Sequence, residues 1–154
     1  MTIKSFRGLI ADGSIDTITL HTNTGSTGYR IVKFELMPEE MGGTSNEHTV
    51  QVFKIPQTTA SAKIDFSDNT LVAAATVNNS TNATTGPPMV TVIFDNEIFN
   101  QDIFVTHIDN ANANPVNYYI ELEQVKLALD ENTVATLKDI RNIAQSGQWA
   151  NNII

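Results

Sequence analysis

The stretch RIVKFELM at residues 30–37 decides the fold, because apolar and charged side chains alternate along it. Val32, Phe34 and Leu36 fall on one face of an extended chain, and the charged residues between them fall on the other. Alternation with a period of two is typical of a β-strand that buries one face. Pro38 follows at once and predicts the end of the strand, since proline cannot donate a hydrogen bond to a sheet.

Segments of the same kind fill most of the chain. They lie at residues 17–21, 49–55, 89–94, 103–109 and 118–129. The connecting segments are rich in Asn, Thr, Ser and Gly, which are common in turns. The alanine-rich segment 71–77 fits either a strand or a short helix. The apolar alternation changes phase within 118–129, which predicts a β-bulge near residues 123–124.

About seven to nine short strands with regular turns predict an all-β chain, either an antiparallel β-sandwich or a jelly-roll-like barrel. A parallel sheet is not expected, because crossover helices between the strands are missing. Near the C-terminus the period changes, and Val134, Leu137, Ile140 and Ala144 share one face of a helix. We therefore expect a short C-terminal helix, with a terminal strand at 133–137 as the alternative.

The length of 154 residues suits one domain, residues 1–154. Within it, residues 1–13 form either a first strand or an N-terminal arm, and residues 147–154 form a C-terminal tail. Charged residues make up 17% of the chain and apolar residues 41%, which is typical of a folded globular protein. The net charge of −8, with scattered basic residues, argues against direct binding of nucleic acid or of an anionic membrane.

Several site types are disfavoured by composition. The chain has no cysteine, which removes disulfides and thiolate metal sites. No N-terminal segment resembles a signal peptide, and no stretch approaches the roughly 20 apolar residues of a membrane span. Secretion through such a signal is therefore not expected.

The three histidines, His21, His48 and His107, are widely spaced, and we expect structural roles for them. A binding role requires converging partners. One strand order would bring His21 and His107 together near Asp109, but the sequence does not establish that order.

The carboxylates offer two further candidate sites. Asp95, Glu97 and Asp102 are close in sequence, yet they lack the spacing of a calcium loop, so a solvated turn is favoured. Glu121 and Glu123 share a strand face, which allows an acid pair for glycoside hydrolysis. A solvated face or a salt-bridged subunit contact is the favoured interpretation. We expect no catalytic residue, metal or cofactor.

Five segments carry a resemblance to known proteins. They are residues 2–8, 21–28, 94–107, 117–125 and 131–142. These segments resemble a group of small virion structural proteins of marine tailed bacteriophages, of the cyanophage and pelagiphage kind. The resemblance implies a β-rich accessory of the phage head, neck or tail, assembled in the host cytoplasm. It brings no catalytic motif.

The first functional hypothesis is therefore structural: a non-enzymatic capsid decoration or cement protein, or a head–tail accessory. Its partners would be further copies of the chain and the major capsid or neck and tail proteins. Large apolar residues near both ends are the candidate contact residues, since termini fray unless something holds them. They are Ile3, Phe6, Leu9, Trp149, Ile153 and Ile154. The alternative is that both termini fold back on the core.

A carbohydrate-binding module is the second hypothesis. The polar loops at 23–28, 78–88 and 110–115 offer amides and hydroxyls that suit sugar hydroxyls. The aromatic residues that could stack on a sugar ring are Tyr29, Tyr118, Tyr119 and Trp149. Their default role is in a core or an interface. An enzyme is the third hypothesis, with the least support.

Overall fold

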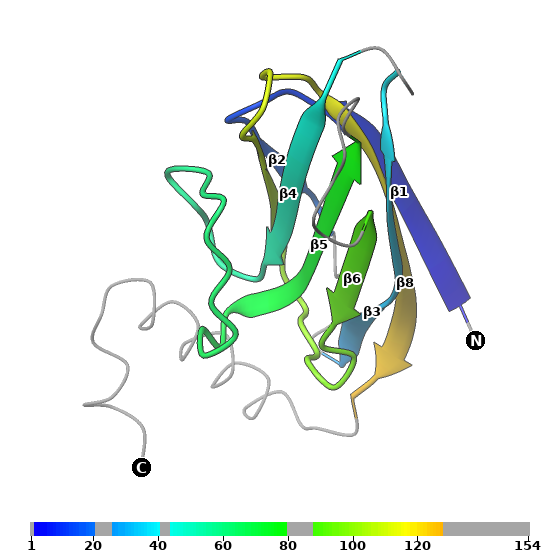
Figure 1. Cartoon of the computed structure of the whole chain (residues 1–154). Helices are drawn as coiled ribbons and strands as arrows, with labels where there is room; N and C mark the ends of the chain where they lie inside the picture. The colour runs from blue at the N-terminus through cyan, green and yellow to red at the C-terminus, as the bar shows by residue number, and fades with distance from the viewer. Residues whose placement is uncertain (1, 21–25, 41–43, 80–87, 128–154) are drawn as a thin grey trace.

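The computed structural model describes residues 2–20, 26–40, 44–79 and 88–127, which form a sandwich of two antiparallel β-sheets (Figure 1). The strands are β1 (Thr2–Ile10), β2 (Ile15–Ile18), β3 (Thr27–Pro38), β4 (Asn46–Phe53), β5 (Leu71–Asn79), β6 (Met89–Ile93), β7 (Ile103–Asp109) and β8 (Val116–Lys126). One sheet has three strands in the order β1-β8-β3, and the other has five in the order β2-β7-β4-β5-β6. The predicted all-β antiparallel sandwich is confirmed. The expected C-terminal helix lies outside the described residues.

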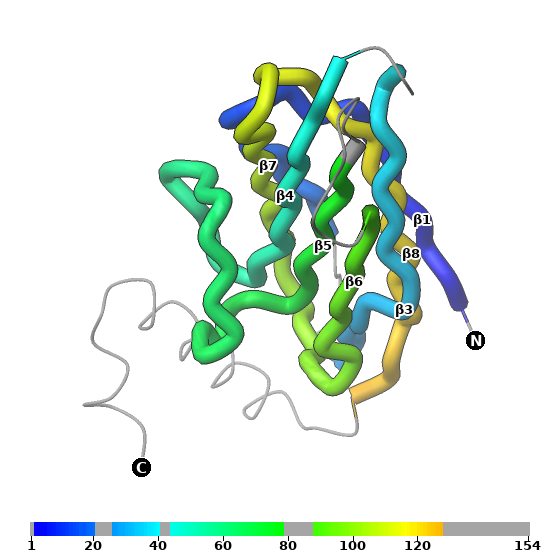
Figure 2. The backbone as a smooth tube through the Cα atoms, in the orientation of Figure 1, coloured from blue at the N-terminus to red at the C-terminus, as the bar shows by residue number. Residues whose placement is uncertain are grey.

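Each sheet combines strands that are distant in sequence, which the tube in Figure 2 makes easy to follow. The chain passes from the three-stranded sheet to the five-stranded sheet between β1 and β2, through the turn at residues 11–14. The alanine-rich segment, ambiguous in the sequence, is strand β5. Ala73 and Ala75 on this strand are buried in the core.

The hydrophobic core lies between the sheets. Ile120 and Leu122 of β8 and Val50 and Val52 of β4 are all fully buried. Side chains from most other strands complete the same cluster, including Ile10, Ile31, Phe34, Leu36, Ile103, Val105 and Val116. Burial of apolar area on this scale is the main force that holds two sheets face to face.

The predicted β-bulge lies on a different strand from the one expected. The register between β3 and β8 shifts between Ile31 and Lys33, whereas β8 is paired without a shift from Gln124 through Lys126. Val32 is the extra residue, and its side chain is 36% exposed while Ile31 is buried. The prediction that Val32 shares the buried face of Phe34 was therefore wrong, because the bulge reverses the alternation at this point.

Strand β4 is buried on both faces. Val50 and Val52 point into the core, while Thr49 and Gln51, on the opposite face, are also buried. The long loop between β4 and β5 lies against this second face at Gln51. Its attachment includes two hydrogen bonds that Gln51 Nε2 donates, to the carbonyls of Ser61 (2.9 Å) and Lys63 (3.0 Å).

Candidate interaction face

The outer face of the three-stranded sheet is the best candidate for a functional surface. The register places its side chains in rows across the three strands, with β8 in the middle. One row is Arg7, Tyr119 and Glu35, and the next is Leu9, Asn117 and Met37. We call this surface the outer face; it comprises Ile3, Ser5, Arg7 and Leu9 of β1, Asn117, Tyr119, Glu121 and Glu123 of β8, and Arg30, Val32, Lys33, Glu35 and Met37 of β3.

Exposed apolar side chains are concentrated on the outer face. Among the described residues, nine large apolar side chains are exposed, and four of them lie here. They are Ile3 (43% exposed), Leu9 (50%), Val32 (36%) and Met37 (68%). A gathering of apolar side chains rimmed by polar ones is typical of a contact surface.

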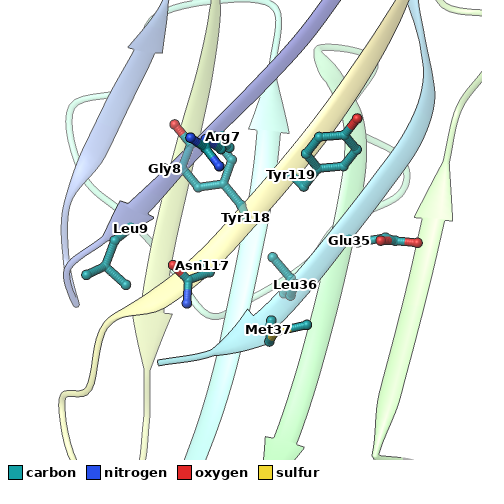
Figure 3. A pocket seen from close by; sticks show the side chains of 9 residues that line it. All are labelled: Arg7, Gly8, Leu9, Glu35, Leu36, Met37, Asn117, Tyr118 and Tyr119. Atoms are coloured by element: carbon teal, nitrogen blue, oxygen red, sulfur yellow. The ribbon is translucent and has the colours of Figure 1, made fainter. Parts of the chain in front are cut away.

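A hollow of about 480 Å³ lies over the two rows (Figure 3). Arg7 and Leu9 stand on its β1 side and Glu35 and Met37 on its β3 side, with Asn117 and Tyr119 on β8 between them. The remaining lining residues are Gly8, Leu36 and Tyr118. A volume of this size is in the range of small-ligand sites and of pockets that receive a partner's side chain.

Some charged side chains of the outer face have ion-pair partners and others do not. Arg30 forms a salt bridge with Glu123 (3.3 Å), and Lys33 lies 3.7 Å from Glu35 in a largely exposed pair. By contrast, no hydrogen bond or ion pair joins the side chain of Arg7 to any residue that the structure describes. The guanidinium of Arg7 is therefore available to an incoming carboxylate.

The tyrosine of this face is oriented by its neighbours. Tyr119 donates its hydroxyl hydrogen to a carboxylate oxygen of Glu121 (2.7 Å), and the ammonium of Lys33 lies 6.0 Å from its ring centroid. The hydrogen bond to Glu121 raises the pKa of the Tyr119 phenol above its ordinary value. Tyr119 is thus a fixed, flat apolar surface at the edge of the hollow.

The candidate contact residues near the N-terminus lie on two different faces of β1. Residues 2–10 are not a free arm, because β1 pairs with β8 from Thr2 to Ile10. Ile3 and Leu9 point outward, whereas Phe6 points inward and packs against the core. A strand places residues three apart on opposite faces, which explains the difference. Trp149, Ile153 and Ile154 lie outside the described residues.

Two of the three histidines are in contact, and the pairing of His21 with His107 stays a prediction because His21 lies outside the described residues. His107 contacts His48, and the distance from His48 Nδ1 to His107 Nε2 is 2.8 Å. Both side chains are almost fully buried, on the adjacent strands β4 and β7. His107 Nδ1 lies 3.1 Å from the carbonyl oxygen of Ala11, which can only accept. His107 Nε2 is then the acceptor in the neutral ring, and His48 Nδ1 is the donor.

Burial disfavours the charged form of both rings. Burial, followed by the neighbouring His107, lowers the pKa of His48 to about 4. Burial also lowers the pKa of His107. No described residue donates a hydrogen bond to the buried His48 Nε2. The pair is therefore neutral at pH 7 and fills a structural position in the core.

Asp109 organises the chain next to the histidine pair. Its carboxylate accepts hydrogen bonds from the backbone N–H groups of Glu47 (2.9 Å), Ala111 (2.9 Å) and Asn114 (2.7 Å). Burial by itself would raise the pKa of Asp109, but these three donors together bring it below the ordinary value. The loop after β7 is thus fixed by backbone donors; Ala113 in this loop has a positive φ of 57°.

The carboxylates considered for a calcium site have separate partners. Glu97 forms a salt bridge with Lys54 (2.9 Å), and Asp102 accepts the backbone N–H of Leu20 (2.8 Å). Asp95 is exposed in a turn. In the part of the chain that the structure describes, no three His, Asp or Glu side chains gather in a way suited to holding a metal.

The acid pair on β8 lies on the outer face. Glu121 accepts the Tyr119 hydroxyl and Glu123 pairs with Arg30. The ion pair of Glu123 lies within the chain, and the salt-bridged contact with a neighbouring subunit stays a prediction.

Two of the aromatic residues considered for sugar stacking are inaccessible. Tyr29 is 2% exposed, and Tyr118 is 6% exposed. Tyr118 donates its hydroxyl hydrogen to Asp16 (3.0 Å) across the two sheets, and burial raises its pKa well above the ordinary value. Tyr118 also lines the hollow but is almost fully buried, so Tyr119 is the accessible stacking candidate there among the described residues.

No known protein family matches the chain, and no curated protein is significantly similar to it. Across the described ranges, no helix has the length and apolar character needed to cross a membrane.

Proposed function

We propose that this chain is a non-enzymatic structural protein of a tailed phage particle, acting as a capsid decoration or cement protein or as a head–tail accessory. The observation that supports it best is the outer face, where exposed apolar side chains surround a hollow. The resemblance of five segments to small phage virion proteins supports the same class. In such a protein the function is contact between subunits.

Contact through this face is physically reasonable. Specific protein–protein interfaces bury roughly 800 Å² per partner, an area that three strands with side chains of this size can supply. Leu9 and Met37 would form the apolar centre of the contact, with Arg7 and Glu35 at its polar margin. A polar margin around an apolar centre is the usual composition of such interfaces.

Quantitative mass spectrometry of purified particles tests this proposal. Particles of the phage that encodes the chain are purified on a density gradient, and the ratio of the chain to the major capsid protein is measured. We expect a fixed ratio that survives a salt wash. Recovery of the chain only in the soluble fraction of the lysate would overturn the proposal.

A carbohydrate-binding module is the second candidate, and the hollow beside Tyr119 is the observation in its favour. The ring of Tyr119 would stack on the CH face of one sugar, while Asn117 and Glu35 would bind hydroxyls. A glycan array tests this directly. Binding that is lost in Tyr119→Ala and retained in Lys63→Glu, a change on the distant loop, would favour this candidate over the first.

A further inference from the structure

We infer that the outer face binds a second copy of this chain about a two-fold axis parallel to β8, with Arg7 of each copy on Glu35 of the other. The inference deepens the proposed function, on which it rests, by naming one partner and the residues in contact. Four features of the outer face carry it: its order of strands, its opposite flanking charges, its apolar flanks and its self-complementary middle strand.

The order of strands places opposite charges symmetrically about β8. Arg7 on β1 and Glu35 on β3 both lie beside Tyr119, one on each side. Neighbouring strands are about 4.8 Å apart, so the two charged residues stand on strands about 10 Å apart. Figure 3 shows them on opposite sides of the hollow.

A rotation of 180° about an axis parallel to β8 exchanges the positions of β1 and β3. Arg7 then faces Glu35 of the partner subunit, and Glu35 faces the partner's Arg7. Each contact is therefore made twice, as a two-fold interface requires. Arg7 has no ion-pair partner among the described residues, and Glu35 has only the exposed, 3.7 Å contact with Lys33. Both side chains can thus engage a new partner without breaking a buried pair.

The apolar side chains of the next row obey the same symmetry. Leu9 and Met37, which are 50% and 68% exposed, flank Asn117 on β1 and β3. The rotation places Leu9 opposite the partner's Met37, and Met37 opposite the partner's Leu9. Burying two large apolar pairs in this way stabilises the contact by removing their exposed area from water.

The middle strand is compatible with its own copy. Asn117 would meet Asn117 of the partner subunit within the hollow, and a side-chain amide can both donate to and accept from a second amide. Tyr119 would meet the partner's Tyr119, and two aromatic rings pack favourably when they are offset. The acidic residues of β8, Glu121 and Glu123, lie farther along the strand, beyond the two rows in contact. There Glu123 is already paired with Arg30.

Charge exchange tests the inference. Static light scattering across a concentration series gives the dimer dissociation constant of the wild-type chain and of three variants, R7E, E35R and R7E/E35R. Each single change places two like charges in both contacts, and we expect it to weaken the dimer about tenfold or more. The double variant restores opposite charges, and we expect it to recover most of the affinity.

A matched control separates this effect from net charge. Lys63 is exposed on the loop that covers the other sheet, and K63E changes the net charge by the same amount as R7E. We expect K63E to dimerise like the wild type. N117W fills the hollow from the middle strand without changing charge, and it should block the dimer while circular dichroism shows an intact fold.

Three results would overturn the inference: a wild-type chain that stays monomeric throughout, single exchanges without effect, or a double exchange that fails to recover binding. If neither charge variant folds, an unchanged dissociation constant in N117W overturns it. The particle measurement under "Proposed function" is independent of these results. A chain found at fixed ratio in particles, yet monomeric in solution, would overturn this inference and leave the proposed function standing.

Discussion

The outer faces of the two sheets differ in how far their side chains are exposed to solvent. On the five-stranded sheet, the outward residues Thr49 and Gln51 are 8% and 2% exposed, and the loop between β4 and β5 is hydrogen-bonded to Gln51. On the three-stranded sheet, the outward residues Leu9 and Met37 are 50% and 68% exposed. The loop at residues 54–70 lies beside β4 and away from β3 in Figure 1. The chain thus covers part of one outer face itself, at β4, and leaves the outer face of the three-stranded sheet accessible, which is the pattern expected if a partner supplies the second cover.

The largest effect should come from the residue that links the two sheets. Ile120, at the centre of β8, is fully buried, and its neighbour Tyr119 lies on the outer face. Ile120→Ala should lower the free energy of unfolding by about 2–5 kcal/mol, because it leaves a cavity between the sheets. Tyr119→Ala should lower it by less than about 1 kcal/mol. Urea denaturation measures both losses of unfolding free energy. Equal losses would contradict the assignment of Ile120 to the buried face of β8 and of Tyr119 to its exposed face.

Lowering the pH should reduce the free energy of unfolding through the buried residue His48. The pKa of His48 is lowered from 6.5 to about 4 by burial, so the unfolded chain takes up a proton that the folded chain does not. Stability from the neutral ring is complete above pH 6.5 and is lost as the pH falls toward 4. The expected loss in unfolding free energy across this window is about 2–3 kcal/mol.

The expected loss of stability in acid has a cause in the geometry of the pair His48 and His107. His48 Nδ1 already donates its hydrogen to His107 Nε2 (2.8 Å), so acid must protonate His48 Nε2, which is buried without a hydrogen-bond partner among the described residues. Unfolding midpoints measured at intervals from pH 7.5 to 4 test the expected slope. His48→Gln, whose amide does not titrate, should flatten the slope, and a slope equal to that of the wild type would assign the acid effect to other groups.

The next effect concerns the packing of β1 on β8. A Cβ at Gly8 would lie 2.9 Å from two atoms of the Tyr118 side chain, closer than packed atoms approach. Gly8→Ala should therefore cost about 1–3 kcal/mol of unfolding free energy, as overpacking usually does. The change should also displace the Tyr118 hydroxyl from Asp16.

Gly13→Ala is the matched control for this prediction. Gly13 has a φ of 76° and open space around its Cβ position, so alanine there strains the backbone without a clash. In a Tyr118→Leu background, which removes the ring, Gly8→Ala should cost less, while the cost of Gly13→Ala should not change. A cost of Gly8→Ala that is independent of Tyr118 would refute the clash.

Sequence patterns predicted the strands well and the surfaces less well. Alternation in the stretch at residues 30–37 identified β3, because one of its faces is buried. The bulge at Val32 was not foreseen, since Ile31 and Val32 are both apolar and either can follow the pattern. A period-two reading of residues 3–9 would have grouped Ile3, Ser5, Arg7 and Leu9 on one face and excluded Phe6.

Contacts between distant strands could not be predicted from one sequence. The outer face depends on the order β1-β8-β3, which joins residues more than 80 positions apart, such as Glu35 and Tyr119. The pair His48 and His107 likewise depends on β4 lying next to β7. Local alternation carries no information about which strands become neighbours, since that choice is made by tertiary packing. The sequence therefore predicted which residues are charged or apolar, but not which residues they contact in the fold.

The smallest effect tests the cover of the five-stranded sheet directly. Gln51→Ala removes the donor to the carbonyls of Ser61 and Lys63, and it should cost about 1–2 kcal/mol of unfolding free energy. Asn117→Ala is its counterpart, because it removes an exposed amide from the middle strand of the other outer face, and it should change stability by less than about 0.5 kcal/mol. Limited proteolysis adds a local measurement, in which Gln51→Ala should speed cleavage within residues 54–70. If cleavage there is unchanged, the loop is held by contacts other than Gln51, and the cover of that face does not depend on this side chain.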